Sequence, residues 1–209
     1  MTEIVLCLAL VAMALFALRR TSFAAQPIDS YATAEPGFEL DRHLAGPLLS
    51  EGVIFGPTGK TAARFTARMH GEWHGDTATL NEEFRFASGA RQSRCWHIVR
   101  GTGGAFSATA EDVIGTARGQ CAGNAIRMRY KLRLEADAGG HVLNVTDWLF
   151  LMPDGSIINR SEFRKFGLKL GELVATIRPA QNSGTTSTDW RLVCSPDDRI
   201  TPRTGATSA

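Results

Sequence analysis

The feature that most constrains the fold is a run of strictly alternating apolar and basic residues. Its two faces are Ile126, Met128, Tyr130, Leu132 and Leu134 on one side, and Arg127, Arg129, Lys131 and Arg133 on the other. This period of two predicts a β-strand with one buried and one solvated face. We interpret the basic face as an outer wall and not as a nucleic-acid stripe, because the formal net charge is only +2.

Two other segments alternate in the same way. Phe65, Ala67, Met69 and Trp73 share one face of a run near the middle of the chain, and Leu80, Glu82, Phe84 and Phe86 share a face of the next run. Turn signals such as "GPTGK", "HGD", "ASGA", "CAGN" and "PDG" separate the runs at short intervals. The pattern predicts an all-β, antiparallel up-and-down, lipocalin-like barrel of about nine or ten strands, with an open β-sandwich as the alternative.

The hairpin around Pro153-Asp154-Gly155 decides which side chains point inward. If Asp154-Gly155 is a two-residue turn, Phe150 faces Asn159 and Trp148 faces Ser161 on one side of the sheet. Asn159 then points among aromatic side chains, where its amide needs a backbone, water or ligand partner. A wider turn would exchange the two faces.

A barrel of this size is filled by side chains or holds one small ligand. We expect a hydrophobic or amphipathic ligand, such as a fatty acid or lipid, with Glu82 or Asn159 orienting its polar head. The expected ligand-binding residues are Trp73, Glu82, Phe84, Trp96, Met128, Tyr130, Trp148, Phe150 and Asn159. We expect no catalytic residue, no metal ligand and no cofactor.

Two other functions stay open. One is a packed barrel that scaffolds other envelope proteins through its rim. The other is a lipid- or ester-modifying enzyme with Glu82, Asp112 or Asp147 as acid or base, which requires converging titratable groups in one cavity. His70 and His74 have the spacing of a helical metal pair, but on a strand that spacing places them too far apart to share one metal ion.

The two ends of the chain differ from its centre. Residues 1–25 contain the apolar stretch Ile4–Leu18 and are expected to be a signal or membrane anchor. Residues 26–36 are expected to be a linker, 37–179 the barrel domain and 180–209 a disordered tail. We expect a periplasmic, membrane-associated protein of the cell envelope. Because Arg19 and Arg20 follow the apolar stretch, an anchor facing the cytoplasm is the alternative.

The cysteines show no metal-binding spacing. Of Cys7, Cys95, Cys121 and Cys194, only Cys95 and Cys121 fall within the expected barrel. In an exported protein these two could form a disulfide, and two buried thiols are the alternative.

Three blocks carry a resemblance to a known family. They are "GPTGKTAARFTARMHGEWHGDTATLNEEFRF", "ATAEDVIGTARGQCAGNAIRMRYKLRL" and "DWLFLMPDGSIINRSEFRKFGLKLGELVATIRP". Together they resemble a bacterial family known as domain of unknown function 3833, over roughly Phe38 to Pro179. The resemblance implies a small envelope protein, often a lipoprotein, and no established activity or catalytic residue. Cys7 departs from the family pattern, because the residues before it do not suit lipidation.

Overall fold

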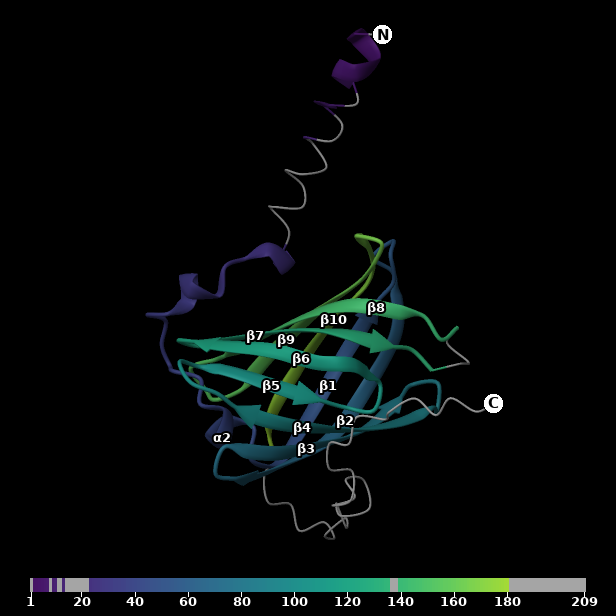
Figure 1. Cartoon of the computed structure of the whole chain (residues 1–209). Coiled ribbons are helices and arrows are strands. Elements are labelled where there is room, and N and C mark those ends of the chain that lie inside the picture. The colour runs from purple at the N-terminus through teal and green to yellow at the C-terminus, as the bar shows by residue number, and fades with distance from the viewer. Residues whose placement is uncertain (1, 8, 11–12, 14–22, 136–138, 181–209) are drawn as a thin grey trace, which may run out of the picture.

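Ten antiparallel strands form one closed barrel in the computed structural model of this chain (Figure 1). The structure describes residues 2–7, 9–10, 13, 23–135 and 139–180. The strands are β1 (Gly46–Phe55), β2 (Thr61–His74), β3 (Thr77–Phe86), β4 (Arg91–Arg100), β5 (Ala105–Thr109), β6 (Val113–Ala122), β7 (Ala125–Arg133), β8 (Val142–Leu151), β9 (Ile157–Lys165) and β10 (Leu168–Pro179).

Each strand pairs with its neighbours in sequence, and β1 pairs with β10 to close the ring. That last pairing is antiparallel and runs from Leu48 opposite Pro179 to Phe55 opposite Glu172. Closure removes the exposed edges that an open sheet would present for aggregation. The predicted up-and-down barrel is therefore confirmed, and the open sandwich is not formed.

The alternating run that predicted the fold forms β7. Ile126 and Leu132 are buried on the inner face, whereas Arg129 and Lys131 are exposed on the outer face. The side chains of successive strand residues point to opposite faces, so one strand supplies both cavity lining and solvated wall.

The two ends of the barrel differ. At one end, termed the closed end, lie α2 (Leu40–His43) and the turns after β2, β4, β6 and β8 (Figure 1). Leu40 and Leu44 line the interior there, and the Leu44 carbonyl approaches Gly71 so closely that a Cβ would lie 1.8 Å from its oxygen. Glycine is therefore needed where this segment crosses β2. The other end, termed the open end, carries the turns after β1, β3, β5, β7 and β9.

The chain before β1 packs on the outer wall. Two short 3-10 helices, η1 (Phe23–Ala25) and η2 (Ile28–Tyr31), lie over Trp148, Phe150 and Ala125. The expected linker thus contains residues held against the barrel. Among the described residues, none of the helices has the length and apolar character needed to cross a membrane. The expected tail, 180–209, falls outside the described residues from position 181 onwards.

Candidate functional site

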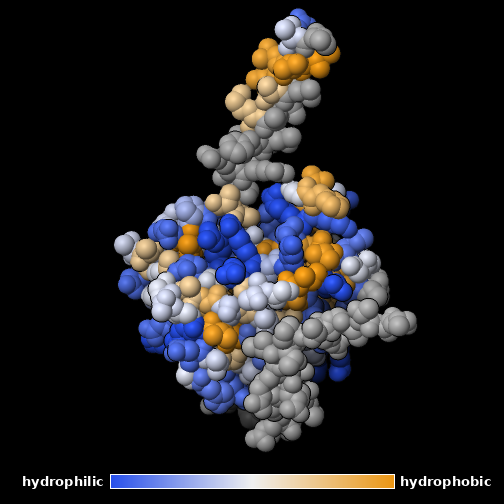
Figure 2. Space-filling model, viewed as in Figure 1, coloured by the Kyte–Doolittle hydropathy of each residue, from blue (hydrophilic) through white to orange (hydrophobic). Residues whose placement is uncertain are grey.

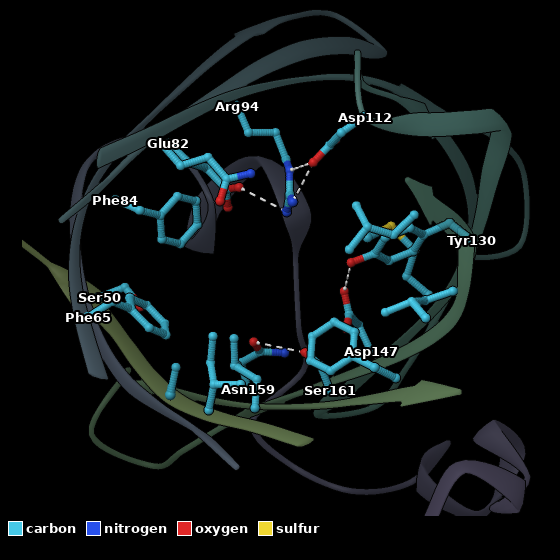
Figure 3. A pocket seen from close by; sticks show the side chains of 18 of the residues that line it. Ser50, Phe65, Glu82, Phe84, Arg94, Asp112, Tyr130, Asp147, Asn159 and Ser161 are labelled. Carbon is cyan, nitrogen blue, oxygen red and sulfur yellow. Dashed lines mark hydrogen bonds and ion pairs between the residues drawn. The ribbon is translucent and has the colours of Figure 1, made fainter. Parts of the chain in front are cut away.

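A cavity of about 710 Å³ occupies the barrel interior. Its lining is mainly apolar and includes a group of aromatic rings from β2 and β3. Phe65 lies edge-on to Phe84, with ring centroids 5.4 Å apart, and Phe84 stacks with Phe86 at 6.4 Å. Figure 3 shows Phe65 and Phe84 on one side of the open space and polar side chains on the others.

The first polar group is an ion network from β3, β4 and the β5–β6 turn. Arg94 donates to Asp112 Oδ2 from both Nε and Nη2, at 2.9 and 2.6 Å. Its Nη1 lies 3.8 Å from Glu82 Oε2, which also accepts a 3.3 Å hydrogen bond from Trp96 Nε1. One guanidinium therefore pairs with two neighbouring carboxyl groups.

The second polar group comes from β7, β8 and β9. Tyr130 donates its hydroxyl hydrogen to Asp147 Oδ2 at 2.9 Å. Ser161 is paired with Asp147 across the two strands, and its hydroxyl donates to Asn159 Oδ1 at 3.4 Å. The Trp96 ring, which belongs to the first group, lies edge to face with the Tyr130 ring, with centroids 5.3 Å apart. The two polar groups are therefore neighbours.

Burial changes the acid–base properties of these groups. It raises the pKa of Glu82 to about 7, although Arg94 and the Trp96 hydrogen bond oppose the rise. Burial also raises the pKa of Asp147, and the Ser161 and Tyr130 hydroxyls offset part of this. For Arg94, burial alone would lower the pKa, but Tyr130, Glu82 and Asp112 hold it above its ordinary value, so Arg94 stays charged.

Two carboxylate oxygens in the cavity have no hydrogen-bond donor. Among the described residues, nothing donates to Asp112 Oδ1. The Ser161 hydroxyl lies close enough to Asp147 to lower the pKa of that carboxyl, but it donates to Asn159 Oδ1 at 3.4 Å and so leaves Asp147 Oδ1 without a donor among these residues. Both oxygens are almost without accessible surface. Both residues line the same cavity. A buried acceptor left unpaired is destabilising by about 1–3 kcal/mol, so such atoms normally find a partner. Both oxygens lie just behind the cavity surface, so a ligand donor reaches them only when the Asp112 or Asp147 side chain turns toward it.

Six of the residues expected at the site line this cavity. They are Glu82, Phe84, Trp96, Met128, Tyr130 and Asn159. The Asn159 amide has a backbone partner, because its Nδ2 donates to the Trp148 carbonyl at 3.1 Å. Their role in ligand binding stays a prediction.

The expected register of the β8–β9 hairpin was wrong by one residue. Leu151 pairs with Ile157, and Leu149 pairs with Asn159. Met152 N–H donates to the Ser156 carbonyl, so the loop between the strands has three central residues, Pro153, Asp154 and Gly155. The wider turn exchanges the faces, as a one-residue shift must. Trp148 and Phe150 therefore point outward and pack under the N-terminal segment instead of lining the cavity.

Trp73 also lies away from the cavity lining. Its indole Nε1 donates to the Leu44 carbonyl at 3.3 Å, and the Arg100 guanidinium stands 5.2 Å from the ring centroid. These contacts hold Trp73 at the closed end, where β2 runs beyond the interior.

Sequence reasoning missed Arg94 as the internal partner of Glu82. Arg94 precedes Trp96 by two residues on β4, and the two side chains share the inner face. Since Trp96 was expected to point inward, that spacing was a usable signal. Asp112 and Asp147, expected only under the enzyme hypothesis, both line the cavity.

Two further observations concern metal ligands and cysteines. Among the described residues, no group of three or more His, Cys, Asp or Glu side chains is placed to hold a metal ion. Cys95 is part of a disulfide, whereas Cys121 is a free thiol. The two cysteines thus do not pair with each other.

Comparison with known proteins gives matches in solved structures and in one family. The protein Rv2717c from M. tuberculosis is 15% identical over 71% of this chain and 99% of its own, with a TM-score of 0.48. A redesigned beta barrel is 11% identical over 66% of this chain and 93% of its own, with a TM-score of 0.36. No curated protein matches. The profile of one family matches residues 17–179, and the chain therefore belongs to the family described as protein of unknown function (DUF3833).

Proposed function

We propose that this barrel binds one amphipathic molecule, with its apolar part on the aromatic wall and its polar part at the Asp112 and Asp147 carboxyl groups. The cavity volume of about 710 Å³ lies within the range of small-molecule sites. An apolar cavity with a few polar groups is also their usual composition. A barrel with a packed interior, which the scaffold hypothesis requires, does not fit this cavity.

The carboxyl groups of Asp112 and Asp147 carry the proposal, because each lines the cavity and has one oxygen without a donor among the described residues. They accept hydrogen bonds, so the ligand's polar part is a donor: a hydroxyl, an amide N–H or an amine. A carboxylate is a poor match, because Arg94 already serves Asp112 and Glu82. The fatty acid named among the expected ligands is therefore disfavoured at this position, and an alcohol, amide or amine with an apolar tail is favoured.

A matched ligand series tests the proposal. Decanol, decylamine and decanoate share one tail and differ only in the polar group, so isothermal titration of each isolates the contribution of that group. We expect decanol and decylamine to bind roughly ten-fold more tightly than decanoate. Equal or tighter binding of decanoate would overturn the assignment of the polar group.

A pair of variants locates the polar group. Asp147→Asn replaces the acceptor oxygen pair with an amide and should weaken decylamine binding roughly ten-fold. Glu83→Gln is the matched control, because Glu83 lies on β3 beside Glu82 and is not among the cavity-lining residues. If both variants bind decylamine like the wild type, Asp147 does not contact the ligand.

A second candidate function is acid–base chemistry on the bound molecule. The cavity holds Glu82, Asp112 and Asp147 together, and Glu82 has a pKa of about 7, suited to proton transfer near neutral pH. Hydrolysis of short p-nitrophenyl esters, lost in Glu82→Gln and kept in Glu83→Gln, would support it. Absence of turnover across an ester series would leave binding alone.

We further propose an envelope location and a membrane link through the N-terminal apolar stretch. The composition of Ile4–Leu18 supports both. Fractionation of cells that express the full chain tests them, and recovery in the soluble cytoplasmic fraction would contradict both.

A further inference from the structure

The β9–β10 turn exposes two large apolar side chains. Phe166 is 88% exposed and Leu168 is 69% exposed. Lys165 pairs with Leu168, so the turn has two central residues, Phe166 and Gly167, with φ of 52° and 81°. Two-residue turns of this type favour Asn-Gly, and left-handed backbone is unfavourable for a bulky aromatic residue. The fold itself does not require a phenylalanine here.

This turn stands at the mouth of the cavity. Leu170 and Gly171, just beyond it on β10, line the cavity, as does Phe163 before it on β9. Lys165 Nζ lies 3.0 Å from His141 Nδ1, which joins the turn to the end of the β7–β8 connection. Figure 1 shows the turn projecting past the barrel wall, and Figure 2 shows apolar surface at the same place.

The two ends of the barrel differ in charge. The open end carries Lys60, Arg91, Arg133, Lys165 and Lys169, and its described acidic residues include Glu111, Asp112, Glu135 and Glu172. Asp112 is paired with Arg94 in the cavity, and Glu172 is paired with Lys169 and Arg160, so the remaining charges at this end are mostly basic. The closed end carries Glu35, Glu39, Asp41, Asp76 and Asp154 against Arg42 and Arg100, and Asp41 and Asp76 pair with Arg100. Near a negatively charged surface, this separation of charge favours the orientation in which the open end faces that surface.

The N-terminal segment also leads toward the open end. Arg127 donates to the Gln26 carbonyl and Arg129 to the Ala24 carbonyl, each at 3.2 Å. Traced backwards from Gln26 to Ala24, the chain thus moves along β7 toward Arg133, which lies at the open end. The apolar stretch Ile4–Leu18 and the pair Arg19-Arg20 precede this point in the sequence.

We propose that the open end docks on an anionic lipid bilayer. In this arrangement Phe166 and Leu168 insert at the interface, and the basic residues of the open end lie against the headgroups. Aromatic and aliphatic side chains partition into this region, and lysine and arginine near it are attracted to anionic lipids. The mouth of the cavity then faces the membrane. This docking goes beyond ligand binding and does not depend on which molecule the cavity holds.

Hydrogen exchange of the full chain gives a local measurement that separates this turn from the N-terminal segment. Vesicles of phosphatidylcholine with phosphatidylglycerol should slow exchange at Lys165–Lys169, and vesicles of phosphatidylcholine alone should do so less. The Asp154–Ser156 amides at the closed end serve as the internal control and should not change. Unchanged exchange at Lys165–Lys169 would overturn the proposal. Protection without vesicles that grows with protein concentration would overturn it in favour of a second copy.

A variant tests the same point through the side chain. Phe166→Asn introduces the residue that this turn prefers, so thermal unfolding should occur at the same or a higher temperature. Because the N-terminal apolar stretch can hold the full chain on the vesicles by itself, the readout is the local exchange protection at Leu168 and Lys169 on phosphatidylglycerol vesicles, which should nevertheless fall roughly ten-fold. Met152→Asn, a partly exposed apolar residue at the closed end, is the matched control and should keep the wild-type protection. Equal protection in both variants would contradict insertion of Phe166.

Discussion

Asp147 and Trp148 are neighbours on β8, yet they are buried for different reasons. Asp147 points into the cavity, where Oδ2 has the Tyr130 hydroxyl and Oδ1 has no donor among the described residues. Trp148 points outward and is completely buried beneath Phe23, Ile28 and Tyr31. The comparison shows a wall whose outer face is sealed by its own chain and whose inner face holds unused polar groups. The first arrangement stabilises the fold, and the second equips it for a ligand.

Removing the outward side chain should have the largest effect on stability. Trp148→Ala deletes a fully buried ring whose centroid lies 5.5 Å from that of Tyr31 and 5.7 Å from that of Phe150. We expect the free energy of unfolding to fall by about 3–5 kcal/mol in urea titrations. A fall below about 1 kcal/mol would mean that the N-terminal segment does not seal this face in solution.

The carboxyl groups on the inner face should make the stability of the fold depend on pH. The folded-state pKa of Glu82 is raised to about 7 from an ordinary 4.5, so between these values the folded protein holds a proton that the unfolded chain has released. Stability should therefore fall as pH rises through this window, with Glu82 contributing up to about 1.4 kcal/mol per pH unit, and level off above it. The raised pKa of Asp147 acts in the same direction.

Urea titrations across this pH range measure the slope. Glu82→Gln should flatten it, and Glu83→Gln should leave it unchanged. A wild-type protein that gains stability as pH rises from 5 to 7 would contradict the account, since it would place both carboxyl groups in a solvated environment.

Removing one hydroxyl tests the link between the two polar groups. Tyr130→Phe keeps the ring against Trp96 and removes the donor to Asp147 Oδ2. We expect a loss of about 1–3 kcal/mol in unfolding free energy, because a second oxygen of Asp147 becomes unpaired. A neutral substitution would indicate that water replaces the hydroxyl and that the cavity is wetter than proposed.

The smallest effect is expected at the edge of the outer seal. Phe23 lies 6.1 Å from the Trp148 ring, and the Arg160 guanidinium stands 4.2 Å from the Phe23 ring. Phe23→Ala should lower the unfolding free energy by only about 1 kcal/mol, yet limited proteolysis should cut more quickly near Gln26. Unchanged cleavage would show that η1 is not held on the barrel.

The barrel was predictable because its information is local. Each alternating run, such as Ile126–Leu134, specifies its own two faces, and the glycine-rich turns specify where it ends. The turn at Pro153–Asp154–Gly155 shows the limit of this reasoning. One residue of difference in loop length reversed the side to which Trp148 and Phe150 point, and the sequence offers no strong preference between the two loops.

The site was only partly predictable, because its polar residues come from separate strands. Glu82 was recognised from its place among apolar residues, but its partner Arg94 lies on the next strand and Asp112 in a later turn. Strand register and barrel closure bring these three together. No spacing within one segment encodes that meeting.

The most direct test of the central claim is native mass spectrometry of the purified full chain, followed by solvent extraction of any bound molecule. The account predicts an additional mass in the folded protein and an extracted compound with an apolar body and a hydroxyl, amide or amine group. The same mass should be depleted in Asp147→Asn and kept in Glu83→Gln. An empty protein that also gains no thermal stability from decanol or decylamine would contradict the account.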